Sequence, residues 1–259
     1  MDLGIRGRKA LVTAASQGLG KAIAFALAQE GVDITIVARR KEVVEEAAQE
    51  IRKATGVTVI AVAADITTAA GRSAALAVIP EPDIIVNSAG GTPPGDFRQF
   101  GAEEWAAALT GLMLTPIELM KATLSGMVQR RFGRIVNITS KGMRVPGNIH
   151  PLGNGARGGL TAFVSTIAPE YAQYNVTINN MLPGPFDTDR MIKMAEFSAK
   201  QNDRTFEEEV AIRTAEVPAK RYGRPEEFGA TCAFLCSSHA SFITGQNILI
   251  DGGSAATTF

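Results

Sequence analysis

Apolar runs alternate with helical stretches along the whole chain, and this alternation constrains the fold more than any other feature of the sequence. The predicted strands are short, and several are apolar throughout, as expected for strands that are buried on both faces of a sheet. They cover Lys9–Ala14, Asp33–Ala38, Val57–Ala63, Asp83–Asn87, Gly133–Thr139, about Thr177–Met181, and Asn247–Ile250. Strands separated by helices in this way predict a parallel sheet that is covered on both faces.

The segments between these strands carry helical patterns. We predict helices near Gly18–Glu30, Lys41–Ala54, Thr68–Ile79, Glu103–Arg130, Asn154–Tyr174 and Pro225–Cys236, and a mobile segment that continues to about Thr214. No repeat, low-complexity tract or linker divides the chain. We therefore expect one doubly wound (Rossmann-type) α/β domain over residues 1–259, with a seven-stranded, mostly parallel sheet.

Composition excludes several classes of protein. The 259 residues carry 26 Lys and Arg against 26 Asp and Glu, which argues against binding nucleic acid by neutralising phosphates. No apolar run is long enough for a membrane span, and the first residues do not resemble a signal peptide. Cys232 and Cys236 are one helical turn apart, which predicts small buried side chains rather than a disulfide or metal site. A cytoplasmic location is expected.

A glycine-rich turn lies where the first predicted strand meets the first predicted helix. Glycines there let the backbone approach a pyrophosphate, whose charge the helix N-terminus stabilises. Gly18 would allow close approach of the phosphates, and Gly20 close packing of the helix on the strand. The turn comprises Thr13, Ala14, Ala15, Ser16, Gln17, Gly18, Leu19 and Gly20. A plain helix N-terminus is the alternative interpretation.

Three cations, Arg39, Arg40 and Lys41, follow the second predicted strand. A site selective for NAD usually has an acidic residue there, which accepts a hydrogen bond from the ribose. Cations can instead pair with a 2′-phosphate, and Arg39 is best placed for a bidentate contact. The alternative is a solvated basic helix start, although cations at a helix N-terminus oppose its dipole. The pattern therefore favours NADP(H) over NAD(H).

With these features the sequence resembles the short-chain dehydrogenase/reductase family over nearly its whole length. Further marks are Asp65 in AADI, the segment NSAG at 87–90, GRIVNITS ending at Ser140, NNMLPGP at 179–185 with Thr188, and TGQNILIDGG at 244–253. The resemblance implies that Asp65 and Ile66 flank the adenine. It also implies cofactor contacts for Asn87, Ala89, Gly90, Pro183, Gly184, Phe186 and Thr188. Ala14 departs from the pattern, because the family usually has glycine there; alanine is tolerable if its φ is negative.

The resemblance breaks at the catalytic positions. The family uses Asn, Ser, Tyr and Lys to interconvert a carbonyl and an alcohol. Ser140 matches the serine, but the tyrosine position falls on Gly153, the lysine position on Arg157 and the asparagine position on Leu112. Tyr171 and Tyr174 come too late in the chain to substitute.

Other residues near Ser140 could supply the missing chemistry. His150 titrates near neutrality and could act as acid or base across the space that Gly153 leaves. Arg157 can donate to ribose hydroxyls but is too basic to shuttle protons. Lys141 and Arg144 could bind an anionic substrate or stabilise an enolate, although both could simply be solvated. His150 could likewise be an ordinary surface residue. The glycines at 153, 155, 158 and 159 predict loose first turns of the helix.

Residues 186–214 contain Met191, Ile192, Met194, Phe197 and Phe206. Flexible apolar side chains in a long connection predict a lid over a small, partly hydrophobic substrate. Ordinary packing of a helical insertion is the alternative.

Three hypotheses remain open for the function. The first is an NADP(H)-dependent oxidoreductase with an atypical active site, in which Ser140, His150 and Arg157 are the candidate catalytic residues. The second is a non-redox lyase, dehydratase or isomerase on the same scaffold. The third is a catalytically inactive NADP(H)-binding sensor or structural subunit. The resemblance also implies a homodimer or homotetramer.

Overall fold

The computed structural model describes residues 1–256 and contains one parallel sheet of seven strands. The strand order is β3-β2-β1-β4-β5-β6-β7, and all paired neighbours are parallel. The strands are β1 (Lys9–Thr13), β2 (Asp33–Ala38), β3 (Val59–Ala63), β4 (Ile84–Asn87), β5 (Gly133–Ile138), β6 (Val176–Pro183) and β7 (Asn247–Ile250). The predicted α/β class and the seven strands are confirmed.

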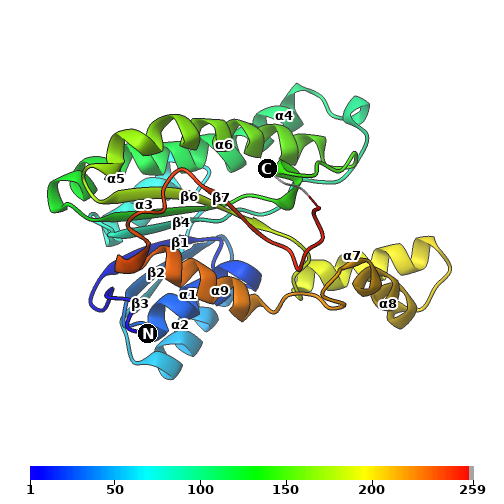
Figure 1. The fold of residues 1–259 in the computed structure, drawn as a ribbon, viewed down its shortest axis with the longest axis horizontal. Helices are drawn as coiled ribbons and strands as arrows, with labels where there is room; N and C mark the ends of the chain where they lie inside the picture. The colour runs from blue at the N-terminus through cyan, green and yellow to red at the C-terminus, as the bar shows by residue number, and fades with distance from the viewer. Residues whose placement is uncertain (257–259) are drawn as a thin grey trace.

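Nine α-helices connect these strands within residues 1–256. They are α1 (Gly18–Gln29), α2 (Lys41–Thr55), α3 (Ala69–Val78), α4 (Ala102–Leu109), α5 (Thr115–Arg130), α6 (Pro151–Ala172), α7 (Asp189–Gln201), α8 (Phe206–Glu216) and α9 (Pro225–Leu235). In Figure 1, α1, α2 and α9 lie on one side of the sheet, and α5 and α6 lie on the other.

Alternation along each strand explains this two-layer cover. Ala10 and Val12 of β1 pack in one core with α1, α2 and α9, whereas Leu11 packs in a second core with α3 and α5. Successive side chains of a strand point to opposite faces of the sheet, so a run of apolar residues must be covered twice. The free cysteines, Cys232 and Cys236, are both buried in the first core, as predicted.

Two predicted segments have more regular structure than expected. The glycine-rich start of α6 is helical from Pro151 onward, three residues before the predicted start. The segment predicted to be mobile forms α7 and α8, which project from the body of the molecule in Figure 1. Arg204, from the junction of these two helices, and Arg213 of α8 both pair with the Glu209 carboxylate, at 3.2 and 2.7 Å, which ties the junction to α8.

The predicted helix over Glu103–Arg130 contains a π-helical turn between α4 and α5, at Thr110–Leu114. The hydroxyl of Thr115 donates to the carbonyl oxygen of Thr110 at 2.8 Å inside this turn. Such turns are common at functional sites. Among the described residues, no helix is long and apolar enough to cross a membrane.

Candidate functional site

Two adjoining clefts lie at the carboxyl ends of the strands. β1 pairs with β2 on one side and with β4 on the other, so the strand order reverses direction there. The connections that leave β1 and β4 therefore diverge and open a crevice, which is where doubly wound sheets bind ligands. Residues common to both clefts are Ala14, Gln17, Ser88, Ala89, Gly90 and Gly91.

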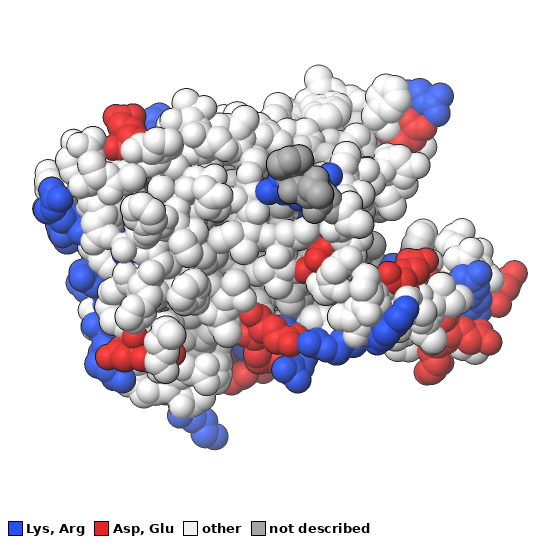
Figure 2. Space-filling model, viewed as in Figure 1, with Lys and Arg blue, Asp and Glu red and all other residues white. Residues whose placement is uncertain are grey.

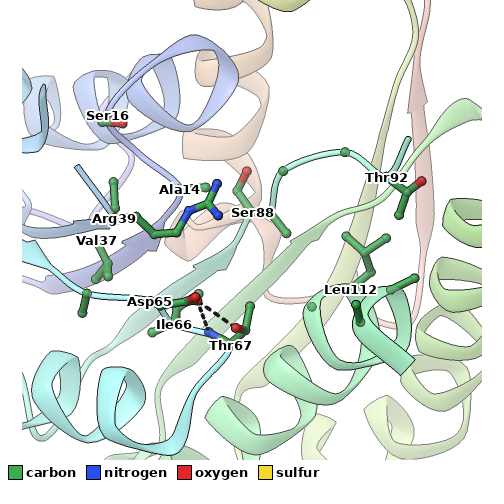
Figure 3. A pocket seen from close by; sticks show the side chains of 18 of the residues that line it. Ala14, Ser16, Val37, Arg39, Asp65, Ile66, Thr67, Ser88, Thr92 and Leu112 are labelled. Atoms are coloured by element: carbon green, nitrogen blue, oxygen red, sulfur yellow. Dashed lines mark hydrogen bonds between the residues drawn. The ribbon is translucent and has the colours of Figure 1, made fainter. Parts of the chain in front are cut away.

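The first cleft, of about 840 Å³, contains much of the predicted cofactor-binding set. Its lining includes Ser16, Gln17, Arg39, Arg40, Asp65, Ile66, Ala89 and Gly90. Figure 3 shows the Arg39 side chain extending across the cleft toward Ala14, with Asp65 and Ile66 on the adjoining wall. The ends of β1, β2 and β3 thus bring these residues to one place.

Glycines shape the junction between β1 and α1, and the close packing predicted at Gly20 is present. Gly18 begins α1 with φ +54°, a conformation that favours glycine. A Cβ atom on Gly20 would overlap the carbonyl oxygen of Ala14, so only glycine allows this approach of helix and strand. The free backbone N–H groups of the first turn of α1 can bind an anion.

Ala14 does not meet the condition set for it by the sequence. Its φ is +49°, in the left-handed region, whereas a negative φ was expected. A side chain in this region costs about 1 kcal/mol or more relative to glycine. The turn therefore retains the backbone shape of a glycine turn, and alanine adds strain to it.

Several charged groups line the first cleft. Two hydrogen bonds from Thr67, at 2.8 and 3.0 Å, lower the pKa of Asp65, and the charge of Arg39 lowers it further. Arg40 donates to the side-chain oxygen of Gln17 at 2.6 Å. Arg39 forms no salt bridge with any described residue, so its guanidinium is available to a phosphate.

Four residues that were predicted to contact the cofactor do not line either cleft. The Thr13 hydroxyl bonds to both backbone groups of Ser88. Gly184 packs against Asp251, where a Cβ atom would lie 2.5 Å from that residue's Cβ. Phe186 is buried against Phe228, with ring centroids 5.0 Å apart. Only the backbone of Phe186 remains for a ligand.

Asn87, the fourth, belongs to a row of amides that crosses four strands. Its side chain donates to Asn137 at 2.8 Å, Asn137 donates to Asn180 at 3.1 Å, and Asn180 donates to Asn247 at 2.8 Å. The four residues are register partners on β4, β5, β6 and β7. The row links the four strands through their side chains at one level of the sheet.

The second cleft, of about 850 Å³, lies between the ends of β4 to β6 and helix α7. Its lining includes the remaining predicted residues Gly18, Leu19, Gly20, Arg157, Pro183 and Thr188. A Cβ atom on Gly18 would lie 3.7 Å from the Thr188 methyl carbon, so α1 and the start of α7 meet here. Met194 and Phe197 of α7 supply an apolar wall.

Arg157 fills the space beside Gly153. A Cβ atom on Gly153 would lie 2.8 Å from Arg157 Nη1 and 3.0 Å from the Thr92 hydroxyl oxygen. Both residues lie on α6, four positions apart, so they share one face of the helix. The guanidinium therefore folds back over the glycine, and the gap is not empty.

Arg157 is a largely buried cation that lacks a carboxylate. Burial lowers its pKa to about 10, and the nearby charge of Arg190 contributes. Its Nε has no hydrogen-bond partner among the described residues. An unpaired buried cation is costly, so this site would be stabilised by a ligand with acceptor oxygens.

His150 and Ser140 take up less direct positions. Burial lowers the pKa of His150, and the charges of Arg190 and Arg157 lower it further. His150 is half-buried, and its neighbour Ile149, rather than His150 itself, lines the second cleft. The Ser140 hydroxyl oxygen accepts from the Gly142 backbone at 3.0 Å. No hydrogen bond within residues 1–256 joins Ser140 to His150 or Arg157.

Leu112 lies in the π-helical turn and lines the first cleft. It is buried in an apolar cluster with Ala108, Leu152 and Ala156. The cluster joins the π turn to the start of α6, so an apolar side chain serves packing at this position. Figure 3 shows Leu112 and Thr92 on the same wall of the cleft.

Sequence patterns did not identify Thr92, Arg190 or Lys193. Thr92 follows the glycines at 90 and 91, and only the fold of α6 brings it to Gly153. Arg190 and Lys193 line the second cleft, although their segment gave only an apolar signal. Their spacing of three residues on α7 is the pattern that could have indicated a shared face.

Known proteins resemble the chain over its full length. Residues 13–255 match the family described as enoyl-(acyl carrier protein) reductase. The NADPH-dependent reductase BacG of Bacillus subtilis is 33% identical over 95% of this chain and 97% of that protein. The 3-oxoacyl-[acyl-carrier-protein] reductase FabG of Vibrio cholerae is 33% identical over 97% of this chain and 98% of that protein.

Among solved structures, the L-sorbose reductase of Gluconobacter frateurii, complexed with NADPH and L-sorbose, superposes with a TM-score of 0.94. It is 32% identical, and the match covers 99% of this chain and 100% of that one. The match of family, relatives and fold agrees with the glycine turn and the switch-point clefts. The chain therefore belongs to the short-chain dehydrogenase/reductase family.

Proposed function

We propose that the protein is an NADP(H)-dependent carbonyl reductase with an atypical active site. The observation that carries the proposal is the first cleft, where Arg39, which has no salt-bridge partner among the described residues, faces a glycine turn at the switch point. The turn and the N-terminus of α1 would hold the pyrophosphate, and Arg39 would pair with a 2′-phosphate. Asp65 and Ile66 would flank the adenine.

The relatives support this choice of cofactor. BacG is named as NADPH-dependent, and the sorbose reductase was solved with NADPH. Selectivity for NADP(H) over NAD(H) rests on Arg39 and Arg40 and on the absence of an acidic residue directly after β2.

At the reaction centre, Gly153 and Arg157 stand where the family has tyrosine and lysine. When bound, NADPH supplies the hydride that reduces the carbonyl carbon, leaving NADP⁺ and an alkoxide that takes up one proton. The Arg157 guanidinium would donate hydrogen bonds to the developing oxyanion, as preorganised donors do where negative charge develops in a transition state. It remains charged at neutral pH, because its pKa is about 10.

The proton must come from another group, since a guanidinium does not release one. His150 is a candidate, because the charge of Arg157 acts on it, and it would donate as the imidazolium. Water is the other source, and Ser140 would position the substrate oxygen. The segment 186–214, which contains α7 and most of α8, would cover the substrate as a lid.

Fluorescence titration with NADPH and NADH tests the cofactor site, and oxidation of NADPH over a panel of aldehydes, ketones and keto acids tests turnover. We expect tighter binding of NADPH than of NADH and slow turnover of at least one carbonyl compound. Absence of NADPH binding at millimolar concentration would refute the proposal. Binding without turnover of any compound would favour an NADP(H) sensor, a reading that the lack of a tyrosine in the described cleft also supports.

A further inference from the structure

We infer that the second cleft selects carbonyl substrates that carry an anionic group, and that Arg190 is the residue that recognises it. This inference deepens the proposed function, because it names the class of substrate for the same site. It rests on the position of Arg190, on the charges that face the cleft, and on the excess of cations over carboxylates in its lining.

Arg190 lies where the two clefts adjoin, close to the candidate catalytic residues. Its guanidinium rests on Gly91, where even a Cβ atom would overlap it. Its charge acts on both His150 and Arg157. The residues that would hold the nucleotide phosphates lie on α1 and after β2, on other elements of the fold, and Gly18, Leu19 and Gly20 of α1 also line this cleft.

The charge that faces this cleft is strongly one-sided. Its lining includes the cations Arg157, Arg190, Lys193 and Arg213 but only one acidic residue, Asp189. Arg213 is paired with Glu209 at 2.7 Å, whereas the other three cations form no salt bridge with any described residue. Two unpaired arginines that repel each other in a cleft create a site for an anion.

The excess of cations in the second cleft is not a general property of the α7–α8 segment. On the face shown in Figure 2, charged side chains of both signs gather on the projecting α7–α8 segment. Acidic groups are therefore available there, yet they are largely absent from the cleft lining. Asp189 is held by Gln17, whose side-chain nitrogen lies 3.5 Å from its carboxylate. A cation in the first turn of a helix opposes the helix dipole, which makes Arg190 unfavourable there without a ligand.

Other residues of α7 extend the second cleft beyond Arg190. Arg190, Met194 and Phe197 line the cleft from successive turns of α7. An anionic group bound at Arg190 would lie near the reacting carbonyl, and the remaining chain of the substrate would extend along Met194 and Phe197. A keto acid with an apolar chain has this pattern.

Matched pairs of compounds test the inference without requiring turnover. Pyruvate, acetoacetate and levulinate place a carboxylate at three distances from a ketone, and their amides are neutral isosteres. Binding of each is measured by calorimetry to protein loaded with NADP⁺, which cannot reduce them, and to protein without cofactor. We expect the acid of at least one pair to bind roughly tenfold or more tighter than its amide, as a charge-assisted hydrogen bond allows.

Two variants assign the effect to Arg190. Arg190→Met should remove the advantage of the acid, and NADP⁺ affinity should stay unchanged. Lys200→Met is the matched control, because Lys200 is an exposed cation on the same helix that lies outside both clefts; it should keep the advantage. Equal binding of acid and amide in every pair, no binding of any acid, or an advantage that survives Arg190→Met would overturn the inference. Acid binding without NADPH oxidation would instead retain it and refute the reductase.

Discussion

The Arg157 guanidinium occupies the volume into which a side chain at Gly153 would have to project, with Nη1 2.8 Å from the position of a Cβ atom. The two replacements are thus coupled in space: the small residue makes room, and the arginine fills it. A tyrosine at 153 and an arginine at 157 cannot both keep these positions.

This coupling predicts the result of restoring the family pair. Gly153→Tyr alone should fold less stably, because the ring must displace Arg157. The double variant Gly153→Tyr with Arg157→Lys should reduce carbonyl substrates faster than the wild type, by on the order of 10² or more, since it regains a general acid. Steady-state kcat with NADPH measures this. Arg157→Lys alone is the control, and equal rates for the single and double variants would contradict the role assigned to the ring.

Cofactor selectivity should depend on Arg39. Arg39→Ala should raise the Kd for NADPH by roughly tenfold, because a charge-assisted contact with the 2′-phosphate is lost, and should leave the Kd for NADH unchanged. Lys41→Ala is a suitable control, since Lys41 is an exposed cation two residues after Arg39 that lies outside both clefts. Equal weakening of both nucleotides in Arg39→Ala would show that the arginine does not read the phosphate.

The positive φ of Ala14 predicts a stabilising substitution. Ala14→Gly should raise the free energy of unfolding by about 1 kcal/mol, because glycine adopts φ +49° without strain. Urea unfolding measures the change. Ala15→Gly provides the contrast, since Ala15 is fully buried in the core and its φ is not positive; this variant should lose stability. A loss of stability in both variants would argue against strain at Ala14.

The asparagine row predicts a large cost for breaking it in the middle. Asn137→Leu leaves the Asn87 amide and the Asn180 carbonyl oxygen without partners in a buried place. Each unsatisfied group costs about 1–3 kcal/mol, so the midpoint of urea unfolding should fall markedly. Asn247→Leu, at the less buried end, leaves only one group unpaired and should cost less. An equal loss of unfolding free energy in both variants would contradict the expectation that the buried middle of the row contributes more than its end.

The lowered pKa of His150 makes two pH dependences predictable. If the imidazolium is the proton donor, turnover should rise as pH falls through a pKa below 6.5. Stability should change in the opposite direction. Below pH 6.5 the unfolded chain binds a proton that folded His150 does not, so the free energy of unfolding should decrease as the pH is lowered. His150→Gln should flatten both profiles. A pH–rate profile that this variant leaves unchanged would assign the proton to water.

Periodicity in the sequence predicted the seven strands and most of the helices around the sheet, and the glycine turn indicated where a cleft opens, because apolar spacing and glycine turns act over a few residues. The same local reasoning identified Arg39, Asp65 and the turn at Gly18. It predicted looseness at the start of α6 from glycine propensity, but packing of Leu152 and Ala156 against the π-helical turn makes that segment helical. Tertiary context outweighs propensities of this size.

The catalytic end depended on contacts between segments that are distant in the chain. Thr92 meets Gly153, and Gly91 meets Arg190, only because the segment after β4, α6 and α7 converge at the carboxyl ends of the strands. The inward side chain of Phe186 and the buried row from Asn87 were likewise decided by packing and strand register. Sequence alone determined which chemical groups the chain contains. The tertiary structure decided which of them share a cleft, because contacts between elements far apart in the chain leave no pattern in the local sequence.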